Sequence, residues 1–148
     1  YYKKPEETAQ AIDAEGWLHS GDMAIMREDE TIRFLGRYKE MLKVGGENVD
    51  PVEVEALLLQ HPAVNQVKVV GVPDPRLQEV ACACVILEPG AQAEPEALMA
   101  FCHGKIASFK IPRYVLFMQE YPMTSSGKVQ KFKLCEDSIE ALGLQCRS

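Results

Sequence analysis

The sequence predicts an α+β fold in which helices flank a small mixed β-sheet. Residues 64–72 and 80–87 are dominated by β-branched and other apolar side chains, which favour strands. Residues 51–60 and 95–106 begin with proline and repeat apolar residues at helical spacing. Because the two patterns alternate without an internal repeat, we expect one compact α+β unit in this part of the chain.

A polar tail with a β-hairpin is expected to precede this unit. A short helix is predicted over residues 6–12. Residues 23–26 and 31–35 predict two strands, and the polar turn 27–30 joins them.

The first helix of the unit carries several start signals. Asp50 is a favourable N-cap, Pro51 suits the first helical position, and Glu53 is spaced to complete a capping box. We therefore expect the helix to begin at residue 51 and to end before His61 and Pro62.

The later elements alternate in the same way. Residues 80–87 are apolar or small on both faces, which predicts a central strand of a covered sheet. Residues 113–119 predict a third strand. A helix over residues 131–142 closes the chain, with four residues expected to face inward: Phe132, Cys135, Ile139 and Leu142.

Composition narrows the class of protein. A formal net charge of −6 argues against non-specific nucleic-acid binding, and no apolar run is long enough to span a membrane. Cys82 and Cys84 alternate on an expected strand, so we interpret them as core residues in a reducing compartment. The chain begins with Tyr1 rather than methionine, so we expect a fragment whose targeting signals are not visible.

Residues 36–51 combine cations, a glycine pair and a helix start. Basic side chains lead to Gly45 and Gly46, where the backbone can approach a ligand, and the helix N-terminus follows. This order is typical of an anion-binding site, although a solvated turn has the same composition. The basic residues are Arg37, Lys39 and Lys43.

Three other polar stretches each allow a functional and an ordinary interpretation. Asp22, at the end of residues 16–22, is a turn aspartate or a ligand for hydroxyl groups. Lys128, within residues 122–131, is a solvated turn residue or a charge donor. Phe109 is a packing anchor or an exposed aromatic in a binding surface.

Together these motifs resemble the acyl-adenylate-forming enzymes, the superfamily of acyl-CoA synthetases, adenylation domains and luciferases. Residues 16–22 are similar to the family motif Gly-Trp-x-His-(Thr/Ser)-Gly-Asp, and residues 36–51 to its hinge and glycine loop. Residues 122–131 are similar to its C-terminal signature Pro-x-Thr-x-x-Gly-Lys. The resemblance covers essentially the whole chain.

The resemblance implies two domains. Residues 1–38 would be the end of the N-terminal AMP-binding domain, and residues 39–148 would form a mobile C-terminal lid. Lys39 falls on the family's hinge position, about which the lid would rotate.

The resemblance also assigns roles to individual residues. It implies that Lys128 contacts the acid carboxylate and the α-phosphate during adenylation, and that Lys43 stabilises the later step. Asp22 would bind the ribose hydroxyls of ATP, and Arg37 would reach toward the nucleotide. The pantetheine tunnel would be lined by Gly45, Gly46 and Glu47.

Coenzyme A would be held at its nucleotide end by a second group, Phe109, Lys110 and Arg113. The resemblance further covers residues 71–79, where Gln78 replaces the glycine usual in the family, so the turn geometry there is an open question. Arg76 in that loop is a phosphate contact or a solvated arginine.

The implied function is an ATP-dependent acyl-CoA synthetase acting on a carboxylic acid. The pattern favours a fatty or aromatic acid, and we expect a fatty acid. Alternatives are an adenylation domain that serves a carrier protein and a non-catalytic adaptor domain. Expected ligands are ATP, coenzyme A, and Mg²⁺ bound mainly by the N-terminal domain, with no metal ligands in this chain. We expect the isolated chain to fold without catalysing, and its location to be cytoplasmic or, given a transit peptide, the mitochondrial matrix.

Overall fold

The computed structural model describes residues 3–145, including all their side chains except those of residues 33–35. Within this range the chain divides into two compact units on either side of the Glu40–Met41 bond. The first unit comprises residues 3–40 and the second residues 41–145. Each unit is described by itself.

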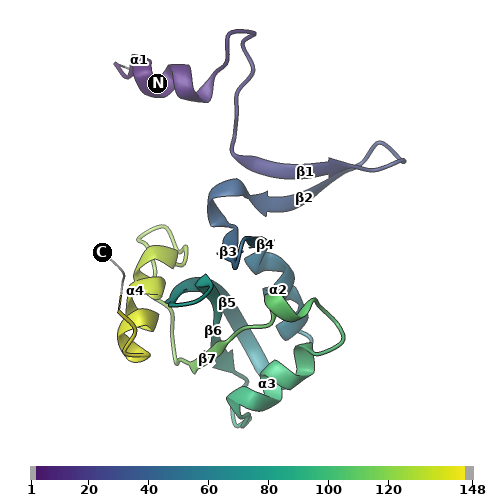
Figure 1. Ribbon diagram of the computed structural model, residues 1–148, viewed down its shortest axis with the longest axis vertical. Coiled ribbons are helices and arrows are strands. Elements are labelled where there is room, and N and C mark those ends of the chain that lie inside the picture. The colour runs from purple at the N-terminus through teal and green to yellow at the C-terminus, as the bar shows by residue number, and fades with distance from the viewer. Residues whose placement is uncertain (1–2, 146–148) are drawn as a thin grey trace. The chain divides into compact units, whose positions relative to one another are not determined.

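The first unit is a short helix followed by a two-stranded antiparallel hairpin (Figure 1). Helix α1 spans Pro5–Ala11, strand β1 spans Asp22–Met26, and strand β2 spans Ile32–Arg37. A 3-10 turn, η1 (Tyr38–Glu40), ends the unit. The predicted helix and hairpin are confirmed, with boundaries shifted by one or two residues.

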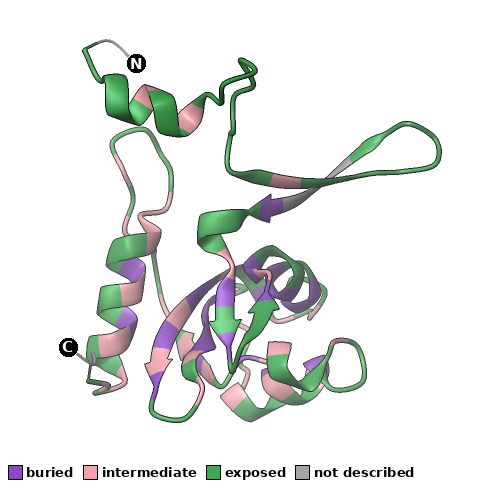
Figure 2. Cartoon of the chain, turned by 45° about the horizontal axis from the view of Figure 1, so that its top comes forward, coloured by how far each residue is buried: buried purple, intermediate pink, exposed green. Residues whose placement is uncertain are grey.

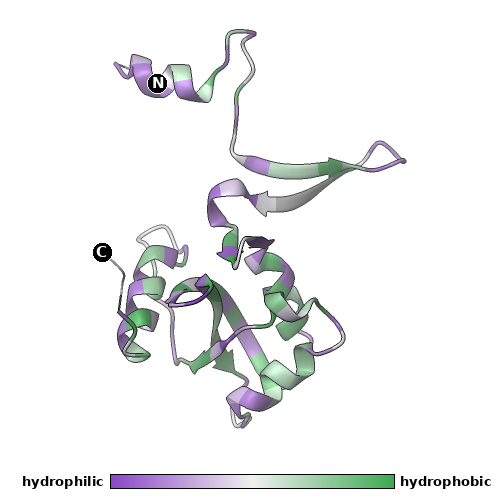
Figure 3. Cartoon of the chain, viewed as in Figure 1, coloured by the Kyte–Doolittle hydropathy of each residue, from purple (hydrophilic) through white to green (hydrophobic). Residues whose placement is uncertain are grey.

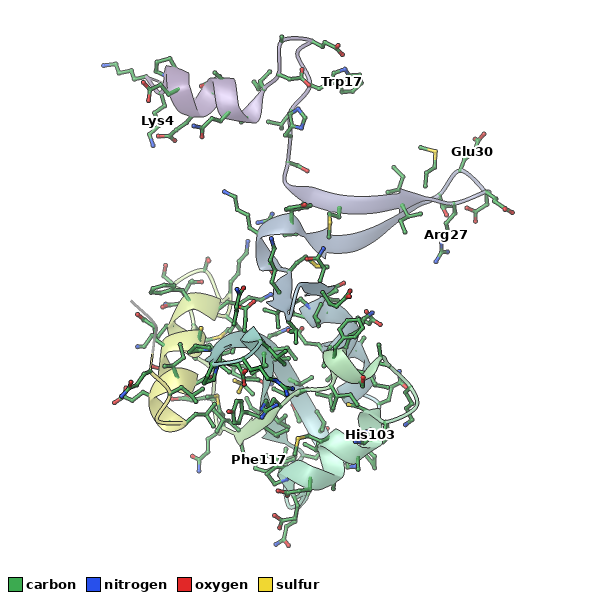
Figure 4. All side chains as sticks on the ribbon, viewed as in Figure 1. Lys4, Trp17, Arg27, Glu30, His103 and Phe117 are labelled. Atoms are coloured by element: carbon green, nitrogen blue, oxygen red, sulfur yellow. The ribbon has the colours of Figure 1, made fainter. Side chains whose placement is uncertain are left out.

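Most of the large apolar side chains of this unit are exposed (Figure 2). Trp17, which is 70% exposed, projects from the loop between α1 and β1 (Figure 4). So many exposed large apolar side chains in a short segment favour a contact with another protein segment. The other exposed residues are Ile12, Leu18, Ile25, Met26, Ile32 and Tyr38.

The second unit contains a five-stranded sheet and three α-helices. Its strands are β3 (Leu42–Val44), β4 (Glu47–Val49), β5 (Val64–Asp74), β6 (Gln78–Leu87) and β7 (Tyr114–Phe117). Its helices are α2 (Pro51–Leu58), α3 (Pro95–Cys102) and α4 (Lys131–Ala141), with a 3-10 turn, η2 (Ser108–Lys110).

Strand β6 is the centre of this sheet. It pairs antiparallel with β5 along its whole length, parallel with β7, and antiparallel with β3 at its first residue. All residues from 80 to 85 are buried, as expected for a strand that is covered on both faces. The apolar residues of β5 and β6 form the core of the unit (Figure 3). The predicted central strand is confirmed.

Helices lie on both sides of the sheet, with α4 on one side and α2 and α3 on the other (Figure 1). Ser138 of α4 is fully buried, and its hydroxyl lies 3.2 Å from the Cys84 thiol of β6. On the other side, the buried Glu55 of α2 accepts a hydrogen bond from the Val69 N–H (3.0 Å). Because β5 is an edge strand, the Val69 N–H could otherwise pair with a strand of another chain. The Glu55 carboxylate satisfies this donor.

Helix α2 begins as predicted, but its capping box is absent. The Asp50 carboxylate accepts a hydrogen bond from the Val52 N–H (2.9 Å), so Asp50 is the N-cap. Glu53 was expected to return to the Asp50 N–H. Instead, its carboxylate forms an ion pair with Lys110 (2.6 Å).

Three other expectations need correction. Phe132 was expected to face the core, but it is 78% exposed. Leu134 and Ser138 define the inward face of α4. Phe132 lies two residues before Leu134, and on a helix that spacing turns a side chain by about 200° around the axis, away from the inward face. Helix α3 ends at Cys102, so Ile106 lies outside it. The short strands β3 and β4 were not expected, because the glycine pair between them was interpreted as a loop.

Gln78 adopts a left-handed backbone conformation, which favours glycine. Its φ is +69°, and Gln78 follows the tight turn between β5 and β6. The turn geometry left open by the sequence is therefore one that suits glycine, and Gln78 adopts it at the cost of backbone strain. A left-handed conformation costs a residue with a Cβ about 1–2 kcal/mol.

We expect Gln78→Gly to raise the free energy of unfolding of the chain by about 0.5–1 kcal/mol. Glycine relieves the backbone strain, and the greater chain entropy of glycine in the unfolded state offsets part of this gain. Chemical denaturation measures the change. Gln66→Gly is the matched control, because Gln66 is an exposed strand residue and glycine there should destabilise by about 0.5–1 kcal/mol. Equal destabilisation by both substitutions would contradict the strain at Gln78.

Candidate functional site

Asp22 and Arg37 lie opposite each other at the open end of the β1–β2 hairpin. They are partners in the strand register, and Arg37 Nε lies 3.0 Å from Asp22 Oδ1. Both side chains reach solvent. The structure thus brings together the two residues predicted to contact a nucleotide. A carboxylate can accept two hydrogen bonds from a vicinal diol, and the guanidinium beside it supplies positive charge.

A cleft of about 630 Å³ lies within the first unit, next to this pair. Its volume is in the range of small-molecule sites. Its lining carries both signs of charge and includes the predicted hinge residue: Glu7, Gln10, Ala11, His19, Ser20, Gly21, Arg37, Lys39 and Glu40.

The loop that leads to Asp22 is organised by Asp13, which sequence reasoning missed. One carboxylate oxygen of Asp13 accepts hydrogen bonds from the N–H groups of Glu15 (3.0 Å) and Trp17 (2.9 Å). The other lies 3.0 Å from His19 Nε2. The Trp17 N–H is the main cause that lowers the pKa of this carboxyl. An aspartate that precedes a glycine turn by a few residues is a recognisable signal for such a loop.

Lys39 lies in η1, directly before the division between the two units. Its side chain is exposed. This place suits the predicted hinge, but rotation about Lys39 stays a prediction.

The glycine pair forms the turn of the β3–β4 hairpin. Gly45 and Gly46 have φ values of +60° and +93°, and two such residues are what a tight hairpin turn requires. Glycine pairs between short alternating segments are a known hairpin signal, so β3 and β4 could have been found in the sequence. Lys43 and Glu47 are exposed on this hairpin, while neighbouring residues Leu42, Val44 and Val49 are buried.

The hairpin packs on the loop between β5 and β6. The Gly45 N–H donates to the Leu77 carbonyl (3.0 Å), and a Cβ on Gly45 would lie 2.9 Å from the Leu77 side chain. Asp74 shapes this loop by accepting hydrogen bonds from the N–H groups of Arg76 (2.9 Å) and Leu77 (2.8 Å). Arg76 contributes its backbone N–H to this loop, and its side chain is exposed, as the interpretation of a solvated arginine expects.

Two of the three residues predicted to bind coenzyme A, Lys110 and Arg113, form ion pairs with carboxylates of this chain. Arg113 Nε lies 3.6 Å from Asp74, and its side chain remains 55% exposed. Lys110 Nζ lies 2.6 Å from Glu53 and is 23% exposed. Phe109 is 37% exposed, and its turn η2 packs against β4. The structure therefore gathers Phe109 and Lys110 beside the glycine hairpin, and their contact with coenzyme A stays a prediction.

Lys128 lies at the end of a closed loop that precedes α4. The loop begins at Tyr121, whose buried hydroxyl donates to the Cys84 carbonyl of β6 (2.8 Å). Burial raises the pKa of Tyr121, so its phenol stays a donor. Thr124 then accepts the Lys128 N–H at its hydroxyl (3.0 Å) and donates its own N–H to the Lys128 carbonyl (2.7 Å). The turn ends at Gly127, where φ is +77°.

The Lys128 ammonium itself is exposed and has no hydrogen-bond or ion-pair partner among residues 3–145. The backbone of this loop is therefore fixed while its charge is free for a ligand. This combination differs from that of Lys110, whose charge is already paired.

Within residues 3–145, no three His, Cys, Asp or Glu side chains lie together as a metal site would require. No helix in the same range is both long and apolar enough to cross a membrane.

The fold and the three ordered motifs define a C-terminal domain of the AMP-forming ligases. The chain belongs to the family of the AMP-binding enzyme C-terminal domain, which residues 53–128 match.

Among individual relatives, YngI of Bacillus subtilis (strain 168) is 53% identical over 144 residues. YngI is named as an acyl-CoA synthetase. The human mitochondrial medium-chain acyl-CoA ligase ACSF2 is 45% identical over 144 residues. Each match covers 97% of this chain, but only 26% of YngI and 23% of ACSF2. The ATP-bound crystal structure of MatB from Rhodopseudomonas palustris superposes with a TM-score of 0.88 at 31% identity, covering 95% of this chain and 28% of MatB. The chain thus spans about a quarter of the length of these relatives.

The Asp74 carboxylate gives the second unit a specific pH dependence. The N–H groups of Leu77 and Arg76, followed by the charge of Arg113, lower its pKa from the ordinary value of 3.8. A lowered folded-state pKa means that the stabilisation is complete above the ordinary value and is lost as the pH falls through the folded-state value.

We therefore expect the free energy of unfolding to fall more steeply with pH below about 4 in the wild type than in Asp74→Asn, whose amide does not titrate. Urea denaturation at several pH values measures both slopes. Parallel slopes for the two proteins would show that Asp74 does not hold the loop as a carboxylate.

Proposed function

We propose that the chain is the C-terminal part of a longer acid–thiol ligase that forms AMP. In the first half-reaction, an oxygen of the acid carboxylate attacks the α-phosphorus of ATP. The bond from that phosphorus to the leaving pyrophosphate breaks, and an acyl-adenylate forms. In the second, the sulfur of coenzyme A attacks the acyl carbon, the bond to AMP breaks, and the thiol proton leaves. Membership in the family and the acyl-CoA synthetase names of the relatives support this proposal.

The observation that carries the proposal is the free ammonium of Lys128 on an ordered loop. In adenylation, an anionic carboxylate must approach an anionic phosphate. A positive charge at their junction offsets this repulsion and stabilises the charge that develops in the transition state. Thr124 fixes the Lys128 backbone, so the flexible side chain begins at a defined position on the loop.

The glycine hairpin serves the second half-reaction in this proposal. Gly45 and Gly46 present no side chains, which leaves room for the narrow pantetheine arm of coenzyme A. Glu47 and Lys43 project from the same hairpin, and Phe109 lies on the neighbouring turn. Aromatic and cationic side chains suit the adenine and the phosphates at the nucleotide end of coenzyme A.

Asp22 and Arg37 bind ATP and its products in both half-reactions. Their ion pair at the end of the hairpin places a carboxylate for the ribose hydroxyls and a cation for the nucleotide. Mg²⁺, which the phosphates of ATP require, is proposed to bind mainly to the N-terminal domain.

The first unit is proposed to be the last part of the N-terminal domain. The exposed apolar side chains of this unit would be buried when its hairpin joins the rest of that domain. Rotation of residues 41–148 about Lys39 would then present the Lys128 loop and the glycine hairpin in turn.

The proposed acid is a fatty acid, since ACSF2 is named a medium-chain ligase. Its name also places ACSF2 in mitochondria. For this chain, the cytoplasm and the mitochondrial matrix are the two proposed locations.

Lys128→Ala in the full-length ligase tests the proposal. We expect acyl-adenylate formation to slow by roughly two to three orders of magnitude, the usual effect of removing one preorganised charge donor. Conversion of chemically supplied acyl-adenylate to acyl-CoA should remain near normal, because the hairpin serves that step. The measurement is each half-reaction assayed separately, by pyrophosphate release and by acyl-CoA formation.

Lys133→Ala is the matched control, since Lys133 is an exposed lysine on the adjoining helix α4. It should leave both half-reactions unchanged. Both variants should keep the free energy of unfolding within about 0.5 kcal/mol of wild type, as surface changes usually do. Normal adenylation by Lys128→Ala, or an equal loss of both half-reactions, would refute the role of Lys128.

A further inference from the structure

The β3–β4 hairpin is attached to the sheet by very little backbone pairing. Its ladder with β6 consists of one residue pair, Val44 and Gln78. The next N–H along β3, that of Lys43, finds no backbone acceptor on β6. It donates instead to the side chain of Glu79, at 2.7 Å from Oε2. A carboxylate thus continues the ladder where the two strands separate.

The Glu79 carboxylate is itself held in place by the opposite strand. Glu79 pairs in register with Pro73 of β5, two residues from Gly71. A Cβ on Gly71 would overlap the Glu79 carboxylate, so glycine at this position makes the space that the carboxylate occupies. Gly71 has no positive φ, so its lack of a side chain, rather than its backbone freedom, is what the site uses.

We propose that Glu79 is a positioning residue for thioester formation, an inference that rests on the proposed function of the hairpin. The carboxylate fixes the backbone of Lys43 and thereby the height and angle of the Gly45–Gly46 turn over the β5–β6 loop. Glu79 touches no reacting atom. It acts through the hairpin, and Gly71 acts through Glu79.

The physical reason is the sensitivity of thiol transfer to geometry. A hydrogen bond from N–H to an ionised acceptor is about twice as strong as one between neutral groups. Without it, the hairpin keeps one backbone pair with β6 and the Gly45–Leu77 hydrogen bond. A displacement of about 1 Å can slow a reaction by a factor on the order of a hundred. The Lys128 loop is anchored separately, through Tyr121, so adenylation should not respond.

The test compares Glu79→Ala and Gly71→Ala in the full-length ligase. Each should slow acyl-CoA formation from supplied acyl-adenylate by about tenfold to a hundredfold and leave adenylation within about twofold. Glu79→Gln, which keeps an oxygen acceptor, should recover most of the rate. In the isolated chain, hydrogen exchange of the Lys43 amide should quicken about tenfold in both alanine variants while the amides of β6 keep their protection.

Glu88→Ala is the matched control. Glu88 follows the far end of the same strand pair, where its carboxylate accepts a hydrogen bond from Asn65 (3.1 Å), and its loss should change neither half-reaction. Unchanged exchange at Lys43, or equal loss of both half-reactions in Glu79→Ala, would overturn the inference. A wild-type ligase that forms no acyl-CoA would instead overturn the proposed function, and the exchange measurement would still decide whether Glu79 holds the hairpin.

Discussion

The second unit depends on the burial of strand β6 on both faces. Two functional loops of the unit, and strand β7, are attached to this strand. The glycine hairpin joins it at Gln78 and through Glu79, β7 joins it at Cys82–Val85, and the Lys128 loop joins it where Tyr121 donates to the Cys84 carbonyl. Because residues 80–85 of this strand are buried, the attachments at Cys82–Val85 cannot move far without disturbing the core, whereas Gln78 and Glu79 lie at the less buried start of the strand. The unit is therefore suited to carry two sets of groups as one rigid body.

The sequence was sufficient for the parts of the fold that follow from local pattern. The central strand, the N-cap at Asp50 and the hairpin of the first unit each have a composition that few other structures share. Sequence reasoning failed where a contact between distant residues decides the outcome. Glu53 satisfies a local capping rule, yet it pairs with Lys110, which lies 57 residues away. Phe132 fits the helical period loosely, but the stripe through Leu134 and Ser138 sets the inward face.

The candidate site shows the same division. The positions of Lys128, Asp22 and the glycine pair could be predicted, because their motifs are specific in residue type and spacing. Glu79 could not, because it acts on the backbone of a distant strand and leaves no pattern at its own position. Asp13 was missed although an aspartate shortly before a glycine turn is a recognisable signal. Gln78 is informative in a third way. It keeps a positive φ without being glycine, which indicates that the turn shape matters more to this loop than the local strain does.

The central claim, that the second unit rotates about Lys39 between the two half-reactions, can be tested directly. The measurement is a comparison of two crystal structures of the full-length ligase, one with ATP and a carboxylic acid and one with acyl-adenylate and coenzyme A. We expect residues 41–145 of the two structures to superpose as one body, while the backbone torsions of Lys39 differ. Lys128 should face the α-phosphate only in the first structure. Loops that rearrange within residues 41–145 while Lys39 keeps its torsions would contradict it.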